Sequence, residues 1–250
     1  MISKSQIKNI TALSHKKMRD EQGLFVAEGE KLILDLMSAF ELKECFATNE
    51  YLNENRNSKI KNLQEISFDE LKKISNQKSP QGILAVFKKP THTLSNNINS
   101  ELSLALDDIQ DPGNLGTIIR IADWFGIRDI ICSTLTADAF GPKTVQATMG
   151  ALARVKVHYT DLEQYIRRLP ADYPVYGTFM EGKNIFTEKL TENGIIVMGN
   201  EGNGISKCIS ALINRRITIP NYPQNEATSE SLNVAVATSV VCAEFRRRLL

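Results

Sequence analysis

The chain has 250 residues, which suits one large domain or two smaller ones, and its formal net charge is only +1. Hydrophobic residues at 42% and charged residues at 24% are typical of a soluble globular protein, and no apolar run approaches the roughly 20 residues that a membrane-spanning helix needs. The N-terminus lacks an apolar signal core, and the four cysteines are widely spaced without a C-x-x-C pair. We therefore expect a cytosolic protein with reduced thiols, without a disulfide framework or a metal site.

The first part of the chain alternates helix-like and strand-like segments, which predicts a small α/β domain over residues 1–90. Apolar residues at helical spacing indicate a first helix over residues 4–13. Strands are expected at residues 24–27, 44–47, 63–66 and 82–87. The last of these strands, GILAVF, is the clearest and is entered through Ser79-Pro80.

Basic residues gather at the start of this domain and precede the first acidic residue, Asp20. They are Lys4, Lys8, Lys16, Lys17 and Arg19. Such a patch attracts a phosphate backbone. A solvated helix face explains the same pattern without a partner, so charge alone leaves both interpretations open.

A polar, Asn/Ser-rich linker at residues 91–101 separates this domain from a second one over residues 102–250. Short apolar runs alternate with helical segments in the second domain. Strands are expected at residues 102–106, 129–132, 154–158, 174–179, 195–198 and 216–219. This pattern predicts an α/β domain with a mostly parallel sheet covered by helices on both faces, closed by a long helix at about residues 231–249.

The first of these strands ends in Asp107-Asp108 and continues into a turn-rich loop, DPGNLG, at residues 111–116, which opens a helix carrying Arg120. Open α/β sheets bind ligands at such a place. The loop lacks both the G-x-G-x-x-G spacing of a dinucleotide site and the G-K-[ST] ending of a P-loop. A dinucleotide-dependent oxidoreductase is therefore disfavoured.

Two further loops follow strands of the same domain. One reads GNEGNGIS at residues 199–206, and the other runs from 221 to 230 into Ser231-Leu232-Asn233. Glycines in such loops let a ligand approach the backbone closely. Structural explanations stay open at this point: Asn114 and Ser231 are suitable helix N-caps, and Arg120 with Glu201 is a possible ion pair.

Three motifs, read together, carry a specific resemblance. They are D-x-x-x-D-P-G-N-x-G-x-x-x-R at 107–120, G-N-E-G-x-G-I at 199–205, and I-P…S-L-N-V-A-V-A at 219–237. In this order they resemble the signature motifs of the SpoU/TrmH family of RNA ribose 2′-O-methyltransferases. FVAEG at 25–29 and SPQGILA at 79–85 are similar to the family's accessory substrate-binding domain, so the resemblance covers nearly the whole chain.

The resemblance implies S-adenosylmethionine as methyl donor, a deep trefoil knot in the second domain, a homodimer formed through that domain, and a ribosomal-protein-like RNA-binding module in the first. It implies an active site made of Asn114, Arg120, Glu201, Ser231 and Asn233. It implies cofactor contacts at Met198, Gly199, Asn200, Gly202, Ile219, Pro220 and Leu232. RNA contacts are then expected at Lys16, Lys17 and Arg19.

The resemblance favours ribosomal RNA as the substrate, with transfer RNA as the alternative, and a non-catalytic RNA-binding protein of the same fold as a further one. The stretch NYPQNEATSE at 221–230 departs from the family pattern because it is longer and more polar than the usual loop. A guanidinium with a pKa above about 12 is an awkward base, so we expect Arg120 to stabilise the developing alkoxide electrostatically.

Overall fold

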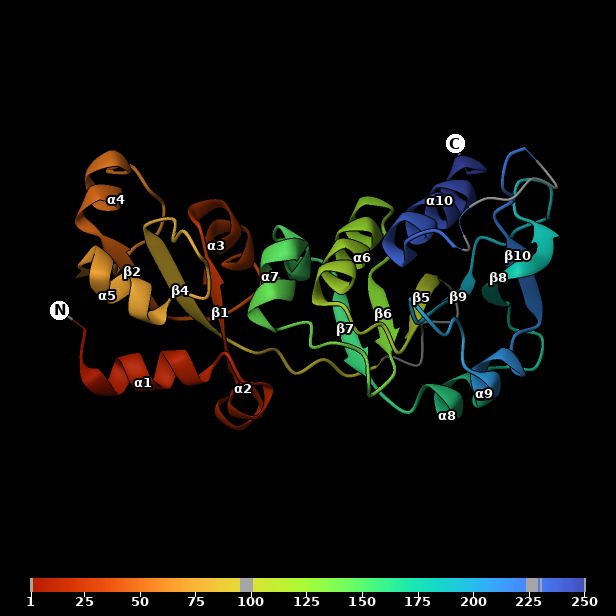
Figure 1. The fold of residues 1–250 in the computed structure, drawn as a ribbon, viewed down its shortest axis with the longest axis horizontal. Coiled ribbons are helices and arrows are strands. Elements are labelled where there is room, and N and C mark those ends of the chain that lie inside the picture. The colour runs from red at the N-terminus through yellow and green to blue at the C-terminus, as the bar shows by residue number, and fades with distance from the viewer. Residues whose placement is uncertain (1, 95–100, 224–228, 230, 250) are drawn as a thin grey trace. The chain divides into compact units, whose positions relative to one another are not determined.

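The computed structural model describes residues 2–94, 101–223, 229 and 231–249 (Figure 1). The chain forms two compact units: unit 1 comprises Met1–Thr91 and Asp138–Arg154, and unit 2 comprises His92–Ala137 and Val155–Leu250. The sequence places one boundary, in the linker, whereas the units are also divided before Asp138 and after Arg154. No helix in the described residues is long and apolar enough to cross a membrane.

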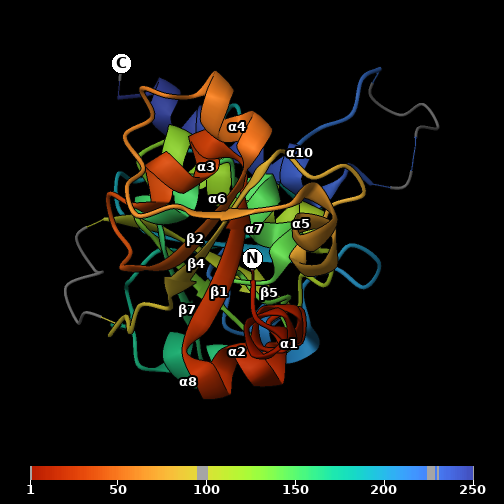
Figure 2. The same cartoon turned by 90° about the vertical axis from the view of Figure 1, so that its left-hand side faces the viewer.

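Unit 1 is built on a mixed four-stranded sheet in the order β1-β4-β2-β3 (Figure 2). The strands are β1 (Leu24–Glu28), β2 (Leu42–Thr48), β3 (Gln64–Ile66) and β4 (Ile83–Lys88). The β1–β4 and β2–β4 pairs are antiparallel, and the β2–β3 pair is parallel. The helices of the unit are α1 (Lys4–Ala12), α2 (Lys16–Gln22), α3 (Glu30–Leu36), α4 (Asn49–Glu54), α5 (Phe68–Ile74) and α7 (Pro142–Thr148), with a 3₁₀ turn at Ala151–Ala153.

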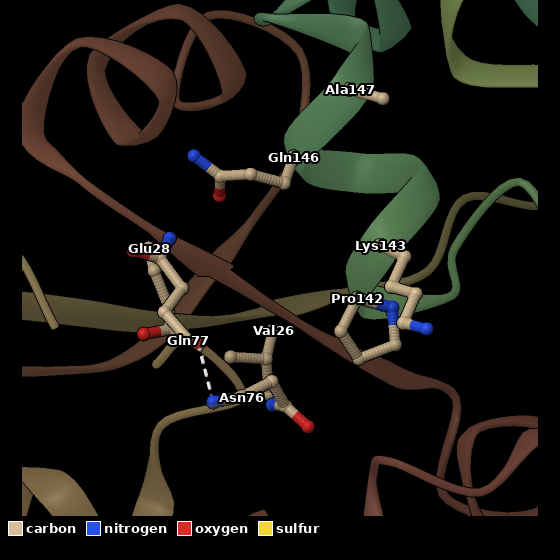
Figure 3. Close-up of a pocket in the computed structure, with 8 residues that line it drawn as sticks. All are labelled: Val26, Glu28, Asn76, Gln77, Pro142, Lys143, Gln146 and Ala147. Atoms are coloured by element: carbon tan, nitrogen blue, oxygen red, sulfur yellow. Dashed lines mark hydrogen bonds between the residues drawn. The ribbon is translucent and has the colours of Figure 1, made fainter. Parts of the chain in front are cut away.

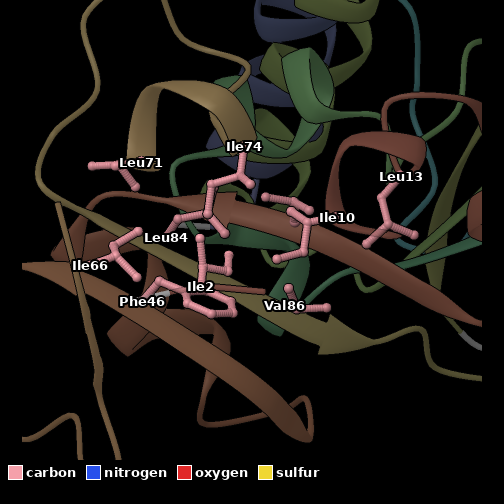
Figure 4. Close-up of a cluster of buried hydrophobic side chains, with 10 residues drawn as sticks. Ile2, Ile10, Leu13, Phe46, Ile66, Leu71, Ile74, Leu84 and Val86 are labelled. Atoms are coloured by element: carbon pink, nitrogen blue, oxygen red, sulfur yellow. The ribbon is translucent and has the colours of Figure 1, made fainter. Parts of the chain in front are cut away.

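Side chains alternate across this sheet, so each face has its own apolar layer. Val26, Leu84 and Val86 pack with Ile10 of α1 and Ile74 of α5 on one face (Figure 4). Both helices begin where the sequence supplies a capping box, with Ser3 paired to Gln6 and Ser67 paired to Glu70. The two capping boxes therefore set where α1 and α5 begin, and these helices cover the apolar layer on this face of the sheet.

The opposite face carries an aromatic cluster that includes a residue from the inserted segment. Phe25 lies 5.4 Å from Phe40 and 5.6 Å from Phe87, between ring centroids. Phe140 lies 5.0 Å from Phe25 in the same measure. Burying such rings together is a large apolar contribution to stability, so Phe140 anchors its segment in unit 1.

A buried ion pair between Arg19 and Asp138 holds the same segment. The closest N–O distance is 2.6 Å, and the two side chains are only 4% and 10% exposed. The Arg19 guanidinium also donates to the main-chain oxygens of Leu13 and Ser14. Because its donors are used inside the unit, Arg19 cannot reach a phosphate, and the expectation that it contacts RNA is corrected to a structural role.

Unit 2 is built on a six-stranded parallel sheet in the order β10-β8-β9-β5-β6-β7. The strands are β5 (Leu102–Asp107), β6 (Asp129–Cys132), β7 (Lys156–Tyr159), β8 (Val175–Asn184), β9 (Gly194–Gly199) and β10 (Arg215–Thr218). The helices are α6 (Pro112–Trp124), α8 (Leu162–Arg167), α9 (Lys207–Ser210) and α10 (Val234–Arg247). The predicted parallel sheet is therefore confirmed, although β8 extends further than the sequence indicates.

Helices cover both faces of this sheet. Leu162 of α8 and Ile209 of α9 pack with Ala105, Ile131 and Val197 on one face. Figure 1 shows α6 and α10 on the other face. Every residue of β5 and β9 is buried, which explains why both strands read as continuous apolar runs.

We predict that removing either partner of the Arg19–Asp138 pair destabilises unit 1. Arg19→Ala or Asp138→Ala leaves a buried charge without its partner, which costs about 3–5 kcal/mol in the free energy of unfolding. Urea unfolding of the full chain measures it. Lys17→Ala is the matched control, because Lys17 is 83% exposed and its pair with Glu21 spans 3.8 Å. Equal stability of the Arg19 and Lys17 variants would contradict this role.

Candidate active site

The candidate site begins at the carboxyl ends of two neighbouring strands. Strand β5 pairs with β9 in a register that places Asp107 opposite Gly199. The chain continues from β5 to β6 on one side, while β9 lies on the other side, so β5 and β9 flank a point where the strand order reverses. Ligands of open α/β sheets bind at such a point.

Side chains from both strand ends tie the first loop to the second. The Asp107 carboxylate, buried at 6% exposure, accepts from the Ser206 backbone N–H at 2.7 Å. Asn200 donates from Nδ2 to the Asp108 carbonyl oxygen at 2.7 Å. Asp108 itself has φ 62°, a left-handed conformation that Asp tolerates better than most residues. These bonds fix the start of each loop relative to the other.

Asn200 also shapes its own loop. Its Oδ1 accepts from the backbone N–H groups of Gly202 and Asn203, both at 2.9 Å. Its main chain forms a bridge with Gly204, whose φ of 67° lies in the left-handed region that favours glycine. The Asn200 carboxamide therefore folds the loop, and the expected cofactor contact of this residue stays a prediction.

A hydrogen-bonded relay joins the three predicted motifs. The Glu201 carboxylate accepts from Asn114 Nδ2 at 2.9 Å, and Asn114 Oδ1 accepts from Asn233 Nδ2 at 3.0 Å. Glu201 also faces the backbone N–H groups of Gln110 and Asp111, each at 3.4 Å. One residue of each motif therefore meets the next through its side chain.

The N-caps of α6 and α10 are not the two residues, Asn114 and Ser231, that the sequence suggested. Asp111, not Asn114, is the N-cap of α6, and it accepts from the Asn114 backbone N–H at 2.7 Å. Asn233, not Ser231, is the N-cap of α10, and its Oδ1 accepts from Ala235 at 3.0 Å and Val236 at 3.3 Å. The Asn114 side chain is thereby left for the relay.

Arg120 lies on the exposed surface of α6. No described residue forms a hydrogen bond or ion pair with it, so the expected alternative of an Arg120–Glu201 ion pair is not observed. Arg120 follows Asn114 by six residues, about 9 Å along a helix axis. Six residues also turn the two side chains about 120° apart around that axis, so Arg120 and Asn114 leave α6 in different directions.

The residues expected to hold a cofactor lie on three segments. Met198 and Gly199 are the buried last residues of β9, and Gly202 is exposed on the loop that follows. Ile219 and Pro220 come directly after β10, which is two strands from β9 in the sheet. Leu232 is half-exposed, at 50%. In the described part of the chain, none of their side chains forms a hydrogen bond with Glu201, Asn114 or Asn233, so their cofactor contacts stay predictions.

The remaining predicted residues lie outside the relay. Ser231 is exposed beside the 221–230 segment, of which residues 224–228 and 230 lie outside the described residues. Lys16 and Lys17 are exposed on α2. Sequence reasoning did not assign a role to Asp107, although a carboxylate closing a fully apolar strand was a usable signal. Among the described residues, no cluster of His, Cys, Asp and Glu could hold a metal ion.

Comparison with protein families assigns both parts of the chain. Residues 101–243 match the model of the SpoU rRNA Methylase family, and residues 4–85 match the MRM3-like substrate binding domain. Together, fold and motifs define a methyltransferase that carries a separate substrate-binding domain. The chain belongs to the SpoU rRNA methylase family.

Relatives match the chain over nearly its full length. It is 31% identical over 244 residues to the 23S rRNA (guanosine(2553)-2′-O)-methyltransferase RlmP of Bacillus subtilis (strain 168), covering 96% of each chain. A TrmH-family structure from Porphyromonas gingivalis is 39% identical with a TM-score of 0.86 and 99% coverage of each chain. An AdoMet-bound rRNA methyltransferase from Sinorhizobium meliloti is 29% identical with a TM-score of 0.84, over 100% of this chain and 97% of that one.

Two substitutions separate the two bonds of Asn233. Asn233→Ala removes both the cap of α10 and the bond to Asn114, and we predict a loss of about 1 kcal/mol in the free energy of unfolding. Asn233→Asp keeps a good cap but removes the Nδ2 donor, so its stability should stay close to that of the unsubstituted chain. Urea unfolding measures both. Similar losses in the two variants would show that the cap is not the stabilising bond.

Proposed function

We propose that this chain transfers a methyl group from S-adenosylmethionine to a ribose 2′-hydroxyl of ribosomal RNA. The observation that carries the proposal is the Glu201–Asn114–Asn233 relay, with the unpaired Arg120 on the same helix as Asn114. The relay fixes amide groups that can orient a ribose, and Arg120 adds a cation that no described residue neutralises. Unit 2 would perform the reaction, and unit 1 would bind the RNA.

The second loop has a surface that fits this cofactor. A Cβ at Gly204 would meet nothing within 4 Å, and one at Gly202 would approach only Asn200 Oδ1, at 3.7 Å. Open space therefore lies beside exposed backbone, where amide and carbonyl groups can bind an adenine or ribose. Met198, Gly199, Ile219, Pro220 and Leu232 complete the proposed contacts, and the half-exposed Leu232 supplies apolar surface.

The reaction is a displacement in which a C–O bond forms as a C–S bond breaks, and the hydroxyl proton leaves to water or an RNA phosphate. S-adenosylmethionine supplies an electrophilic methyl carbon on a positively charged sulfur. Asn114 and Asn233, with Ser231, would hold the ribose so that its 2′-oxygen lines up with that carbon. Arg120 would stabilise the negative charge that develops on the oxygen, because its guanidinium keeps its own proton.

Substitution of Arg120 tests its proposed role in methyl transfer. We expect Arg120→Ala to lower the rate of tritium transfer from labelled S-adenosylmethionine to unmodified ribosomal RNA by about 10²–10³-fold, as removal of a transition-state donor does elsewhere. Arg120→Lys, which keeps the charge without the planar fork, should fall between. Unfolding curves should be unchanged because Arg120 is exposed. A normal rate in Arg120→Ala would refute the assigned role.

The basic residues of α2 are proposed to contact the RNA backbone. Lys16→Ala with Lys17→Ala should weaken RNA binding and reduce the slope of log K against log salt by about 1–2, because each lost phosphate contact removes about one released counterion. A filter-binding salt titration measures the slope. Lys59→Ala with Lys61→Ala, in a loop of the same unit, is the control. An unchanged slope in the α2 variant would leave these lysines as a solvated helix face.

We also propose that unit 2 pairs with a second copy of the chain. Large apolar side chains are exposed on α6 and on the first turn of α10: Trp124 at 84% and Val236 at 53%. Trp124 ends α6 whereas Val236 begins α10, so they are separate exposed side chains, and the proposal rests on the large exposed ring of Trp124. Trp124→Asp should convert a dimeric mass in sedimentation equilibrium to a monomeric one, and a monomeric mass of the unsubstituted chain at micromolar concentration would contradict the proposal.

The trefoil knot stays a prediction, because strand order and register do not specify how a chain threads. A cytosolic location also stays a prediction.

A further inference from the structure

Unit 1 contains a cavity of about 340 Å³ between strand β1, the segment after α5, and helix α7 (Figure 3). It is lined by Val26, Glu28, Asn76, Gln77, Pro142, Lys143, Gln146 and Ala147. Small-molecule sites span roughly 300–1,000 Å³, so this cavity suits a compact group. None of the residues assigned to methyl transfer lines it.

A buried carboxylate forms one wall. Glu28 is 4% exposed and accepts from Ser75 Oγ and, at 2.8 Å, from the Asn76 backbone N–H. A carboxylate offers about four acceptor positions, and Ser75 with the backbone and side chain of Asn76 uses up to three of them, so a ligand with two donors would take the free position and displace the exposed Asn76 carboxamide. Burial raises the pKa of the Glu28 carboxyl, because the charged form has lost solvation, and additional N–H donors would compensate that loss.

Hydrogen-bond donors lie beside this carboxylate. Gln77 Nε2 is buried and has no hydrogen-bond partner among the described residues. Figure 3 shows the Gln146 carboxamide extending from α7 towards the side where Glu28 lies. Lys143 is exposed on α7, and no described residue pairs with it. A ligand at this place meets acceptors and donors side by side, with a cation at the rim.

Apolar groups complete the lining. Val26 of β1 and Pro142 and Ala147 of α7 present hydrocarbon surface to the same space. A few polar groups set in an apolar lining fix the orientation of a flat ligand. Proteins read RNA sequence mainly by taking single unpaired bases into such sites and bonding their edges.

We propose that this cavity receives one unpaired guanine base of the RNA substrate. Guanine is the RNA base that presents two adjacent N–H donors, N1 and N2, to the Glu28 carboxylate, with its O6 acceptor next to them for the amide donors of Gln77 and Gln146. Lys143 would meet a neighbouring phosphate. This inference rests on the proposed function in that the RNA is the substrate, and it assigns base recognition to unit 1.

Binding of short RNAs to the full chain tests the proposal. The probes are fluorescent uridine hexanucleotides with one internal guanosine, adenosine or cytidine, measured by anisotropy. We expect the guanosine probe to bind about tenfold more tightly than the others, because one bidentate pair discriminates by that order. Excess 5′-GMP should compete far less well than the unlabelled guanosine hexanucleotide, since the monophosphate lacks the flanking backbone.

Variants assign the preference to the cavity. Glu28→Gln replaces one acceptor with a donor and should abolish the guanosine preference. Gln146→Ala should reduce the guanosine preference about threefold. If Glu28→Gln unfolds at a lower temperature, the Gln146 variant decides the question, because Gln146 is only partly buried and its loss should leave the fold intact. Lys143→Ala should weaken all probes alike. Lys59→Ala, which does not line the cavity, should change nothing.

Absence of a guanosine preference in the unsubstituted chain, or its persistence in both Glu28→Gln and Gln146→Ala, overturns the proposal. Equal competition by 5′-GMP overturns the RNA base as its occupant in favour of a free nucleotide. Methyl transfer to ribosomal RNA is measured separately. A chain that methylates RNA without the base preference contradicts the cavity alone, whereas a chain that methylates no RNA contradicts the proposed function.

Discussion

The register between β5 and β9 is the constraint on which the site depends. It sets Asp107 opposite Gly199, so the two loops leave the sheet side by side. A Cβ at Gly199 would lie 2.2 Å from the carbonyl carbon of Gly204, so this contact tolerates only glycine. A slip of one residue would turn every side chain of the strand to the other face and separate the loops.

The polar side chains at the ends of β5 and β9 and on the loops that follow are of two kinds: those bonded within the chain and those that are not. Asp107, Asn200 and Glu201 are used inside the chain, where each accepts or donates to a neighbouring loop. A hydrogen bond to a charged group contributes about 1.5–3 kcal/mol, a range that suits the buried Asp107 carboxylate and its bond to the Ser206 N–H. Arg120 is of the other kind. It is exposed and forms no hydrogen bond or ion pair with a described residue, and its part in methyl transfer stays the proposal made above.

Local pattern predicted much of this molecule. Strands such as residues 195–198 were recognisable because their apolar runs are short and bounded by turn residues, whereas a buried helix needs a longer apolar pattern. The three loops were recognisable for their glycines and amides. The caps were not, because Asp111 and Asn114 are both good N-cap residues and the choice depends on which side chain Glu201 engages across the sheet. Arg19 was misassigned for a related reason, since its partner Asp138 lies 119 positions away.

The inserted segment has a consequence for how the chain is made. Unit 1 needs Phe140 in its aromatic cluster and Asp138 beside Arg19, and both come after two strands of unit 2 in the sequence. A chain emerging from the ribosome therefore cannot complete its amino-terminal half on its own. Until residues 138–140 have been synthesised, Phe25 lacks its contact with Phe140, and the Arg19 guanidinium lacks the Asp138 carboxylate. Unit 1 therefore begins first on the ribosome, but its core is completed only after the first two strands of unit 2 have been synthesised.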